Sequence, residues 1–279
     1  MGRVWPLGEV RYSASDNLMN VRRFKRAAEI LHRSALLRRV AKRVARNLTL
    51  TQPFHGGSIA FNAVAHSWAW TGTRNYENFD RELQDRLLAL SFDRPHFIDI
   101  GANVGAMTLS VLLRNPEARA IAVEPGAEAV ALLRHSLRLN GLGGRCEVIN
   151  VAASAEESFL TFDSAGSVMG HVSPGGQSVR AVGIMDIVRQ SETTKPILLK
   201  IDVEGFERSL VPAMKGVLAP AGSSAVIELH PFGFNGLGDP QFCFEQLKAQ
   251  SRFEIRALGG APIDRVDPGA FTQIEVNCL

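Results

Sequence analysis

The clearest pattern along the chain is an alternation of short apolar runs with amphipathic segments. Apolar runs that fit buried strands occupy residues 97–100, 119–123, 146–152, 196–202 and 225–230. Segments with one apolar face at helical spacing occupy residues 81–90, 106–113, 127–139, 184–189, 207–217 and 242–249. Shorter strands are expected at residues 58–64, 158–162, 177–182, 253–257 and 271–276. This alternation predicts an α/β fold with a mostly parallel, doubly wound sheet flanked by helices.

The run at residues 97–100 ends in a glycine turn that opens the next helix, with the pattern Asp99-x-Gly101-x-Asn103-x-Gly105. Glycine lets a ligand approach the backbone and accepts positive φ, and asparagine tolerates the left-handed region best among other residues. Strand, turn and helix together form the nucleoside-binding corner of a doubly wound sheet. We therefore expect Gly101, Asn103 and Gly105 to contact a cofactor.

Two acidic residues narrow the choice of cofactor. A carboxylate at Asp99 would repel the pyrophosphate of a dinucleotide, whereas it attracts the ammonium and sulfonium of S-adenosylmethionine (SAM). Glu124 ends the next strand, about 20 residues past the glycines, where an acid accepts hydrogen bonds from ribose hydroxyls. We expect both residues to bind SAM. An NAD-dependent oxidoreductase is the alternative enzyme class, and the missing Gly-x-Gly-x-x-Gly pattern argues against it.

A second group of charged residues ends the strand at residues 196–202. Because strand side chains alternate, Lys200, Asp202 and Glu204 are expected to project to the same side. Three charges beside an apolar strand are costly unless they are paired or in use. His230 ends another strand, and ligands bind at the carboxyl ends of strands in open α/β sheets. The alternative is that Lys200 pairs with one acid and only holds the strand end.

These motifs together resemble the FkbM family of SAM-dependent methyltransferases. The resemblance covers roughly residues 75–230 and rests on Asp-Ile-Gly-Ala-Asn-Val-Gly at 99–105, Glu124-Pro125, Lys-Ile-Asp-Val-Glu-Gly at 200–205 and Glu-Leu-His at 228–230. It implies a Rossmann-like class I methyltransferase fold and methyl transfer to a hydroxyl of a sugar, glycolipid or polyketide-type metabolite. No nucleic acid partner is expected. A methyltransferase-fold protein that binds without catalysis is a further alternative.

The resemblance also bears on individual site residues. Tyr76-Glu77 is similar to a lead-in element of the family, so both join the expected cofactor-binding residues. A neutral alcohol is a poor nucleophile, and a base that takes its proton typically adds ~10²–10⁴-fold in rate. Asp202 is the first candidate for this base and His230 the second, with Lys200 and Glu204 completing the catalytic set. Alternatively, Asp202, Glu204 and His230 hold a divalent metal, Mg or Mn.

Charge is concentrated at the N-terminus. Residues 1–50 hold twelve Lys and Arg against three Asp and Glu, whereas residues 51–279 hold 19 against 25. Val21, Phe24, Ala28 and Leu31 fall on one helical face, which predicts a basic amphipathic helix, or two, within residues 18–48. Such a helix binds an anionic membrane surface or an acidic partner, or packs on its own domain with a solvated basic face. The Arg-rich, acid-poor composition also resembles a transit peptide.

The length of 279 residues accommodates one α/β domain with an extension. We divide it into a basic amphipathic helical extension at 1–55, a lead-in strand and helix at 56–95, and the methyltransferase domain at 96–279. The aromatic side chains of the lead-in are expected to cover one end of that domain: Trp68, Trp70, Tyr76 and Phe79. The sequence has no apolar run of 18 residues and no signal-peptide core, and its three cysteines are widely spaced. These features predict a cytoplasmic protein with reduced thiols. Peripheral membrane contact through residues 18–48 is an alternative.

Overall fold

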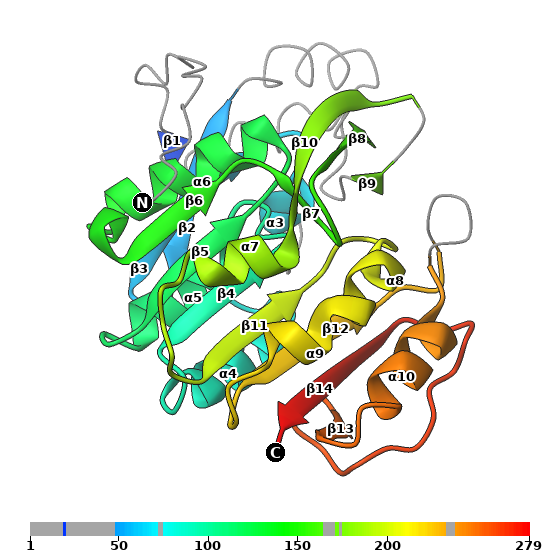
Figure 1. Cartoon of the computed structure of the whole chain (residues 1–279). Coiled ribbons are helices and arrows are strands. Elements are labelled where there is room, and N and C mark those ends of the chain that lie inside the picture. The colour runs from blue at the N-terminus through cyan, green and yellow to red at the C-terminus, as the bar shows by residue number, and fades with distance from the viewer. Residues whose placement is uncertain (1–18, 21–47, 72–74, 164–170, 173–174, 233–237) are drawn as a thin grey trace.

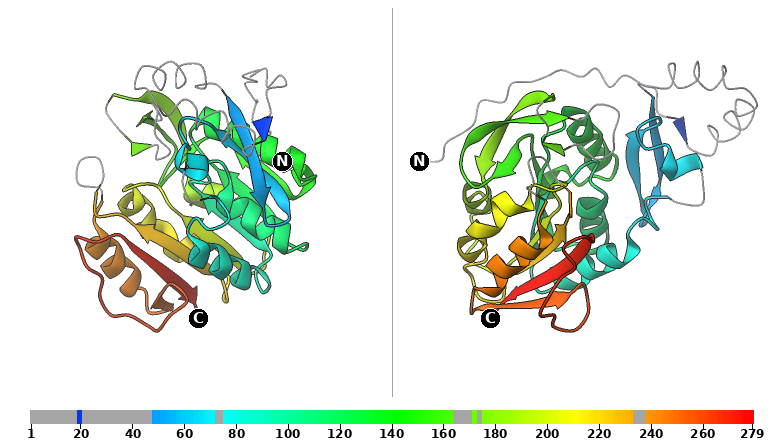
Figure 2. Two further views of the ribbon diagram at one scale, coloured as in Figure 1. Left: turned by 180° about the vertical axis from the view of Figure 1, so that it is seen from behind. Right: turned by 90° about the vertical axis from the view of Figure 1, so that its right-hand side faces the viewer.

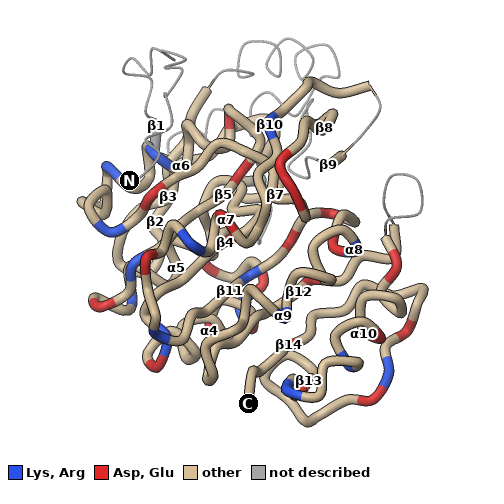
Figure 3. The backbone as a smooth tube through the Cα atoms, in the orientation of Figure 1, with Lys and Arg blue, Asp and Glu red and all other residues tan. Residues whose placement is uncertain are grey.

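The computed structural model describes residues 19–20, 48–71, 75–163, 171–172, 175–232 and 238–279 (Figure 1). The basic amphipathic helix predicted within residues 18–48 therefore lies outside the described residues, apart from 19–20 and 48. Residues Met19–Asn20 were expected to be helical but form the short strand β1, which pairs in parallel with β2 (Thr49–Phe54). Along the described backbone, basic and acidic positions are interspersed (Figure 3).

A seven-stranded sheet forms the centre of the molecule. Its strands, in spatial order, are β6 (Cys146–Ile149), β5 (Arg119–Val123), β4 (His96–Ile100), β11 (Ile197–Ile201), β12 (Ser224–Leu229), β14 (Thr272–Cys278) and β13 (Phe253–Ala257). Numbered along the chain within this sheet, they lie in the order 3-2-1-4-5-7-6. The first five pair in parallel, and β14 runs antiparallel to both of its neighbours. The predicted mostly parallel sheet is confirmed.

Helices cover both faces of this sheet, and each face has its own apolar cluster (Figures 1 and 2). One face carries α4 (Arg81–Ser91), α5 (Ala106–Arg114) and α6 (Ala127–Leu139). The other carries α7 (Ile184–Arg189), α8 (Glu207–Leu210), α9 (Met214–Val217) and α10 (Pro240–Lys248). Short turns of helix complete the fold at α3 (Trp68–Thr71), η1 (Gly143–Arg145) and η2 (Val211–Ala213). Of the helices that the structure describes, none has the length and apolarity to cross a bilayer.

A hairpin of β2 and β3 (Gly57–Asn62) adds a layer outside α6, as the right-hand view of Figure 2 shows. Side chains of α6 and of the residue that follows it bond the free edge of β3: the Ala60 amide donates to Ser136 Oγ at 2.9 Å, and the Ser58 amide donates to Asn140 Oδ1 at 2.8 Å. Strand β3 confirms the prediction for residues 58–64. Strand β2 was not predicted and lies within residues 1–55, so this part of the expected helical extension is a strand. The division of the chain into domains stays a prediction.

The run at residues 146–152, predicted as one strand, belongs to two sheets. It divides at Asn150, whose side-chain amide donates to the carbonyls of Glu124 and Pro125, both at 2.9 Å, and draws the chain away from β6. The following strand β7 (Ala152–Ser154) joins a four-stranded sheet in the order β7-β10-β8-β9. The other members are β8 (Ser158–Asp163), β9 (His171–Val172) and β10 (Gln177–Gly183).

The helix predicted at residues 207–217 is also interrupted. It consists of α8, η2 and α9, and Pro212 lies in the middle segment η2. Proline lacks the backbone N–H that a continuous helix needs, and its ring crowds the preceding turn. The proline therefore tightens this part of the helix into a 3₁₀ turn.

An ion pair fixes α4 against β14. Arg86 donates from Nε to Glu275 Oε2 at 2.6 Å and from Nη2 to Oε1 at 2.8 Å, and the Glu275 side chain is 2% exposed. Burial tends to raise the pKa of Glu275, but the hydrogen bonds from Arg86 and Asn277 outweigh it and hold this pKa below its usual value. The pair ties the helix that precedes β4 to the last strand of the sheet.

Replacing Arg86 is expected to destabilise the fold. The variant Arg86→Ala leaves the buried carboxylate of Glu275 unpaired, so the free energy of unfolding should fall by about 3 kcal/mol in urea titrations. The control Arg189→Ala breaks an exposed pair with Asp186 and should change it by less than about 0.5 kcal/mol. Equal losses in the two variants would contradict a stabilising role for the Arg86 pair.

Candidate active site

A cavity of about 700 Å³ lies at the carboxyl ends of β4, β11 and β12. At this place the sheet order reverses, because the chain continues from β4 to β5 on one side and later returns to β11 on the other. Such a switch point is the usual ligand site of an open α/β sheet. The cavity is lined by the glycine turn, by residues of the lead-in, and by the ends of β11, β12 and β14.

The glycine turn is held tightly against the end of β11. Gly101 has φ of 77°, and a Cβ there would lie 1.7 Å from the backbone oxygen of Asp202. The Asp202 amide in turn donates to the Ile100 carbonyl at 3.0 Å. Asn103 has φ of 50°, which confirms the left-handed conformation expected for it. Gly101 and Asn103 both line the cavity.

Gly105 and Glu124 support the turn from behind the cavity. A Cβ on Gly105 would lie 2.2 Å from Leu133 Cδ1, so this glycine lets α5 approach α6, and it is not among the cavity-lining residues. Glu124 is buried and accepts hydrogen bonds from the amides of Asn103 at 2.9 Å and Gly126 at 2.8 Å. Burial raises the pKa of Glu124 to about 7, although these hydrogen bonds oppose the shift. Contact of Gly105 and Glu124 with a cofactor stays a prediction.

Asp99 and Lys200 form the buried base of the site. They lie opposite each other in the parallel register of β4 and β11. The Lys200 ammonium is 3.6 Å from Asp99 Oδ1, 3.2 Å from Asp202 Oδ2 and 3.1 Å from the Gly101 carbonyl, and Thr108 donates to Asp99 Oδ2 at 2.6 Å. Burial would lower the pKa of Lys200, but the charges of Asp202 and Asp99 outweigh it and raise this pKa above its usual value.

This geometry separates the expected roles of the two residues. Lys200 lines the cavity and also holds the strand end, with two acids rather than one. Asp99 is 0% exposed and is not among the cavity-lining residues. A direct contact of Asp99 with a cofactor therefore stays a prediction, and the contacts in the structure make Asp99 a partner of Lys200.

Asp202, Glu204 and His230 converge in the cavity. His230 Nε2 is 3.6 Å from Glu204 Oε2 and 3.9 Å from Asp202 Oδ1. The sequence predicted that strand alternation would bring the two acids together, but β11 ends at Ile201. Glu204 reaches the cluster through a turn in which it adopts φ of 50°, a conformation that is uncommon for a residue other than glycine. The three side chains are thus brought together as predicted, by a different backbone path.

Burial and the close approach of the three side chains shift the pKa values of His230 and Glu204. Burial would lower the pKa of His230, but the hydrogen bond and charge of Glu207, together with Asp202 and Glu204, outweigh it and raise the pKa to about 9. Burial and the Asp202 charge raise the pKa of Glu204 to about 7. The cluster therefore places three strongly interacting titratable side chains beside the only ammonium among the described cavity-lining residues, that of Lys200.

Aromatic rings form the remaining walls. Trp68 packs on Tyr76 and Phe79 with ring centroids 4.9 and 5.0 Å apart, and all three line the cavity, as expected of a cover over one end of the domain. Phe232 and Phe271 also line the cavity, and each lies 5.1 Å from the His230 ring. The mouth of the cavity is therefore apolar, whereas its base is charged.

Tyr76 and Glu77, the two lead-in residues expected to bind the cofactor, have different surroundings. Tyr76 lines the cavity, and its buried hydroxyl has no hydrogen-bond partner among the described residues. The Glu77 side chain is 47% exposed, 3.9 Å from His55 Nδ1, and does not line the cavity. A cofactor contact is therefore supported geometrically for Tyr76 and stays a prediction for Glu77.

Comparison with known proteins identifies the family. The methyltransferase FkbM domain matches residues 99–250, which is more than half of the chain. The chain belongs to the FkbM methyltransferase family. The family resemblance drawn from the sequence, and with it the assignment to the SAM-dependent methyltransferases, is confirmed.

Individual relatives are more distant. Ribosomal RNA small subunit methyltransferase G of Helicobacter bizzozeronii is 35% identical over 77 residues, which are 26% of this chain and 43% of that protein. The chain thus spans less than half the length of this curated relative. Solved structures include an O-methyltransferase from Bacillus cereus in complex with SAH (14% identity, 72% of this chain and 81% of that one, TM-score 0.44) and a SAM-dependent O-methyltransferase from Thermotoga maritima (13%, 80% and 74%, TM-score 0.42).

Several polar residues at this cavity were not among the expected site residues, and three of them have buried, titratable side chains. His66 is buried and lines the cavity, and burial lowers its pKa to about 4, so its ring is neutral at physiological pH. Glu228 lines the cavity from β12, and burial together with the Asp202 charge raises its pKa. Glu207 bonds His230. Strand alternation already places Glu228 on the side of His230, whereas nothing in the sequence marks His66 or Glu207.

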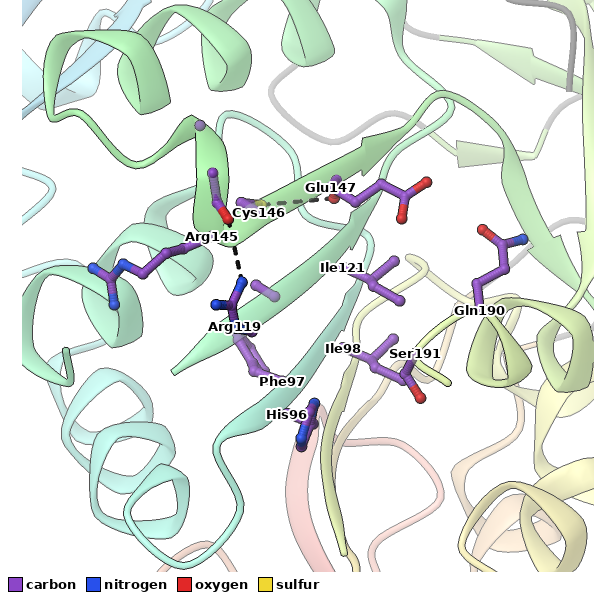
Figure 4. A pocket seen from close by; sticks show the side chains of 13 residues that line it. His96, Phe97, Ile98, Arg119, Ile121, Arg145, Cys146, Glu147, Gln190 and Ser191 are labelled. Carbon is purple, nitrogen blue, oxygen red and sulfur yellow. Dashed lines mark hydrogen bonds between the residues drawn. The ribbon is translucent and has the colours of Figure 1, made fainter. Parts of the chain in front are cut away.

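A second cavity, of about 330 Å³, opens at the other end of the seven-stranded sheet, where β4, β5 and β6 begin (Figure 4). Its basic side chains bond the surrounding backbone. Arg145 donates to the carbonyls of Leu112, Asn115, Pro116 and Ala118, and Arg119 reaches the Gly144 carbonyl at 3.3 Å. These arginines stabilise loops, and the cavity lacks the convergent acids of the first one.

Replacing Gly101 should disrupt the site far more than its backbone angle alone requires. In Gly101→Ala the methyl group meets a backbone oxygen, so the ends of β4 and β11 must separate. The loss of unfolding free energy should exceed the roughly 1–2 kcal/mol that the left-handed conformation costs. The control Gly141→Ala has φ of 67° with open space around the new methyl and should show that smaller loss. Urea unfolding measures both, and equal losses would contradict the close approach.

Proposed function

We propose that this protein transfers the methyl group of SAM to a hydroxyl oxygen of a sugar, a glycolipid or a polyketide-type metabolite. The observation that carries the proposal is the convergence of Asp202, Glu204 and His230 in a cavity that also contains the glycine turn. A carboxylate cluster beside a cofactor turn supplies what a hydroxyl acceptor needs, which is a group that takes its proton.

The residues of the cavity fit SAM. Four carboxylates line it, against the single ammonium of Lys200: Asp80, Asp202, Glu204 and Glu228. SAM carries an ammonium and a sulfonium, and the carboxyl groups of the cavity are suitable partners for both. The volume of about 700 Å³ lies in the range of small-molecule sites. We assign Gly101, Asn103 and Tyr76 to the cofactor, together with Glu124 for the ribose hydroxyls.

The chemistry requires orientation and removal of one proton. SAM supplies an electrophilic methyl group when it is bound. Asp202 takes the proton of the acceptor hydroxyl as the oxygen forms its bond to the methyl carbon, and the electron pair of the S–CH₃ bond remains on sulfur. Lys200 fixes Asp202 through its 3.2 Å contact and thereby sets the direction from which the proton is removed.

The walls of the cavity support an acceptor that combines an apolar face with hydroxyl groups. Trp68, Phe79, Phe232 and Phe271 supply aromatic surface at the mouth, and the acids lie at the base. Sugars, glycolipids and polyketide-type metabolites have both features. An RNA acceptor is disfavoured, because its phosphates would approach a cavity lined by four carboxylates. Peripheral contact of residues 18–48 with an anionic membrane, which would bring a lipid-linked acceptor close, is proposed on their basic sequence alone.

The proposal is tested by label transfer. The purified protein is incubated with SAM that carries a CD₃ group and with a panel of sugar, glycolipid and polyketide hydroxyl compounds, and products are analysed by mass spectrometry. We expect a CD₃ ether on one class of compound. Thermal stabilisation by S-adenosylhomocysteine without any product would favour a non-catalytic binding protein. Absence of both stabilisation and product would reject the proposal.

Glu124 is expected to contribute to cofactor affinity. In Glu124→Gln one oxygen becomes an amide nitrogen, which cannot accept the hydrogen bonds that the carboxylate accepts. Affinity for S-adenosylhomocysteine, measured by calorimetry, should fall by ~1–3 kcal/mol. Glu117→Gln is the control on an exposed carboxylate outside the site and should bind as the wild type does. An unchanged affinity in Glu124→Gln would remove Glu124 from the cofactor site.

Asp202 is expected to act on turnover rather than on cofactor binding. Asp202→Asn keeps the shape of the side chain and removes its charge, so label transfer should slow by at least ~10²-fold, while S-adenosylhomocysteine still binds. The control Asp186→Asn changes an exposed residue of α7 and should turn over normally. Normal turnover in Asp202→Asn would make His230 the residue to test.

A further inference from the structure

We infer that Asp202, Glu204 and His230 form a binding site for a divalent cation, and that Mn²⁺ fits the donor set best. The site deepens the proposed function, because a cation held here lies where the acceptor hydroxyl must be activated. Its existence, however, is argued from the side chains alone and is tested without acceptor or SAM.

The spacing of the donor atoms suits a common ion. One atom from each residue lies within 4.8 Å of the others, and the two His230 distances are 3.6 and 3.9 Å. These separations are too long for hydrogen bonds. Ligands placed about 2.0–2.3 Å from one cation lie roughly 3–4.5 Å from each other, which matches the separations here.

The donor atoms also lack other partners. Asp202 Oδ1 and Glu204 Oε2 are buried, and neither has a hydrogen-bond partner among the described residues. His230 is 6% exposed, and within the same part of the chain its Nε2 forms no hydrogen bond. Buried polar atoms without partners are rare and costly in folded proteins. Two such oxygens, with His230 Nε2 within 3.9 Å of both, indicate a ligand that is positively charged.

Glu207 orients the histidine for this role. Its carboxylate is 1% exposed and accepts a hydrogen bond from His230 Nδ1 at 2.9 Å and from the Gly205 amide at 3.1 Å. Because an ionised carboxylate only accepts, the imidazole donates from Nδ1 and turns Nε2 toward Asp202 and Glu204. A carboxylate behind a histidine is the usual outer-shell arrangement of metal sites. Glu207 is therefore a positioning residue.

The donor chemistry selects the cation. Carboxylates suit Mg²⁺, Ca²⁺ and Mn²⁺, whereas an imidazole ligand favours transition metals, so Mn²⁺ satisfies both preferences. If the proposed methyl transfer holds, a hydroxyl bound to this cation becomes more acidic. Its proton passes to solvent as the O–CH₃ bond forms and the S–CH₃ bond breaks, which leaves S-adenosylhomocysteine. Asp202 then acts as a ligand rather than as the base.

The inference is tested by titrating the full chain with Mn²⁺ and following the free ion by electron paramagnetic resonance. One saturable site per chain is expected, and Asp202→Asn or Glu204→Gln should each abolish it. Glu207→Gln, which touches the cation only through His230, should lower the affinity about 10- to 100-fold. Circular dichroism and thermal unfolding establish that the variants are folded.

The matched control is Glu228→Gln, which removes a buried carboxylate from the same cavity without removing a donor of the cluster. It should keep Mn²⁺ bound. A loss equal to that of Glu204→Gln would mean that general negative charge attracts the ion, and would overturn the site. No saturable Mn²⁺ binding in the wild type would overturn it as well.

Label transfer by chelator-treated protein separates the two proposals. Activity lost with EDTA and restored by Mn²⁺ supports both. Mn²⁺ binding without transfer to any hydroxyl compound leaves the cation site standing and rejects the proposed function. Full transfer after EDTA, with no Mn²⁺ binding, rejects the cation site and leaves Asp202 as the base.

Discussion

The arrangement of the site depends on one buried ammonium group, that of Lys200. Its side chain is 3% exposed, and a charge at such a depth is stable only because two carboxylates and a carbonyl surround it. Those partners come from two strands: Asp99 and Gly101 belong to β4 and its turn, and Asp202 follows β11. The ammonium therefore joins the glycine turn to the acidic cluster, although 99 residues separate Lys200 from Gly101 along the chain.

The sequence predicted the site best where one rule of the α/β fold applies to several strands. Carboxyl ends of parallel strands meet at one edge, so the ends of three apolar runs were enough to bring Gly101, Asp202 and His230 to one cavity. Glu207 was not predicted as a site residue, because its contact with His230 depends on the left-handed turn at Glu204. No local sequence pattern predicts that turn. His66 was not predicted because its place depends on how the lead-in packs, which is a tertiary property.

Two local errors have local causes. In β2 the alternating buried positions are Leu50, Gln52 and Phe54, and a buried glutamine hides the apolar alternation that marks a strand. The segment at residues 207–217 has a helical pattern of apolar positions throughout, so periodicity outweighed the proline in its middle. In both segments a single residue departs from the pattern expected of the element. The burial of Gln52 in β2, and the missing N–H of Pro212 in η2, account for the structure that forms.

Most of the aromatic residues that line the cavity lie outside residues 99–250, which the family match covers. The FkbM match spans residues 99–250, whereas Trp68, Tyr76 and Phe79 precede it and Phe271 follows it. The matched region therefore supplies the glycine turn and the acidic cluster, and the flanking segments shape much of the entrance. Two proteins with the same matched region can thus share a reaction and differ in what they methylate. Membership of the family therefore bears on the type of reaction, whereas the identity of the acceptor depends on the segments outside the matched region.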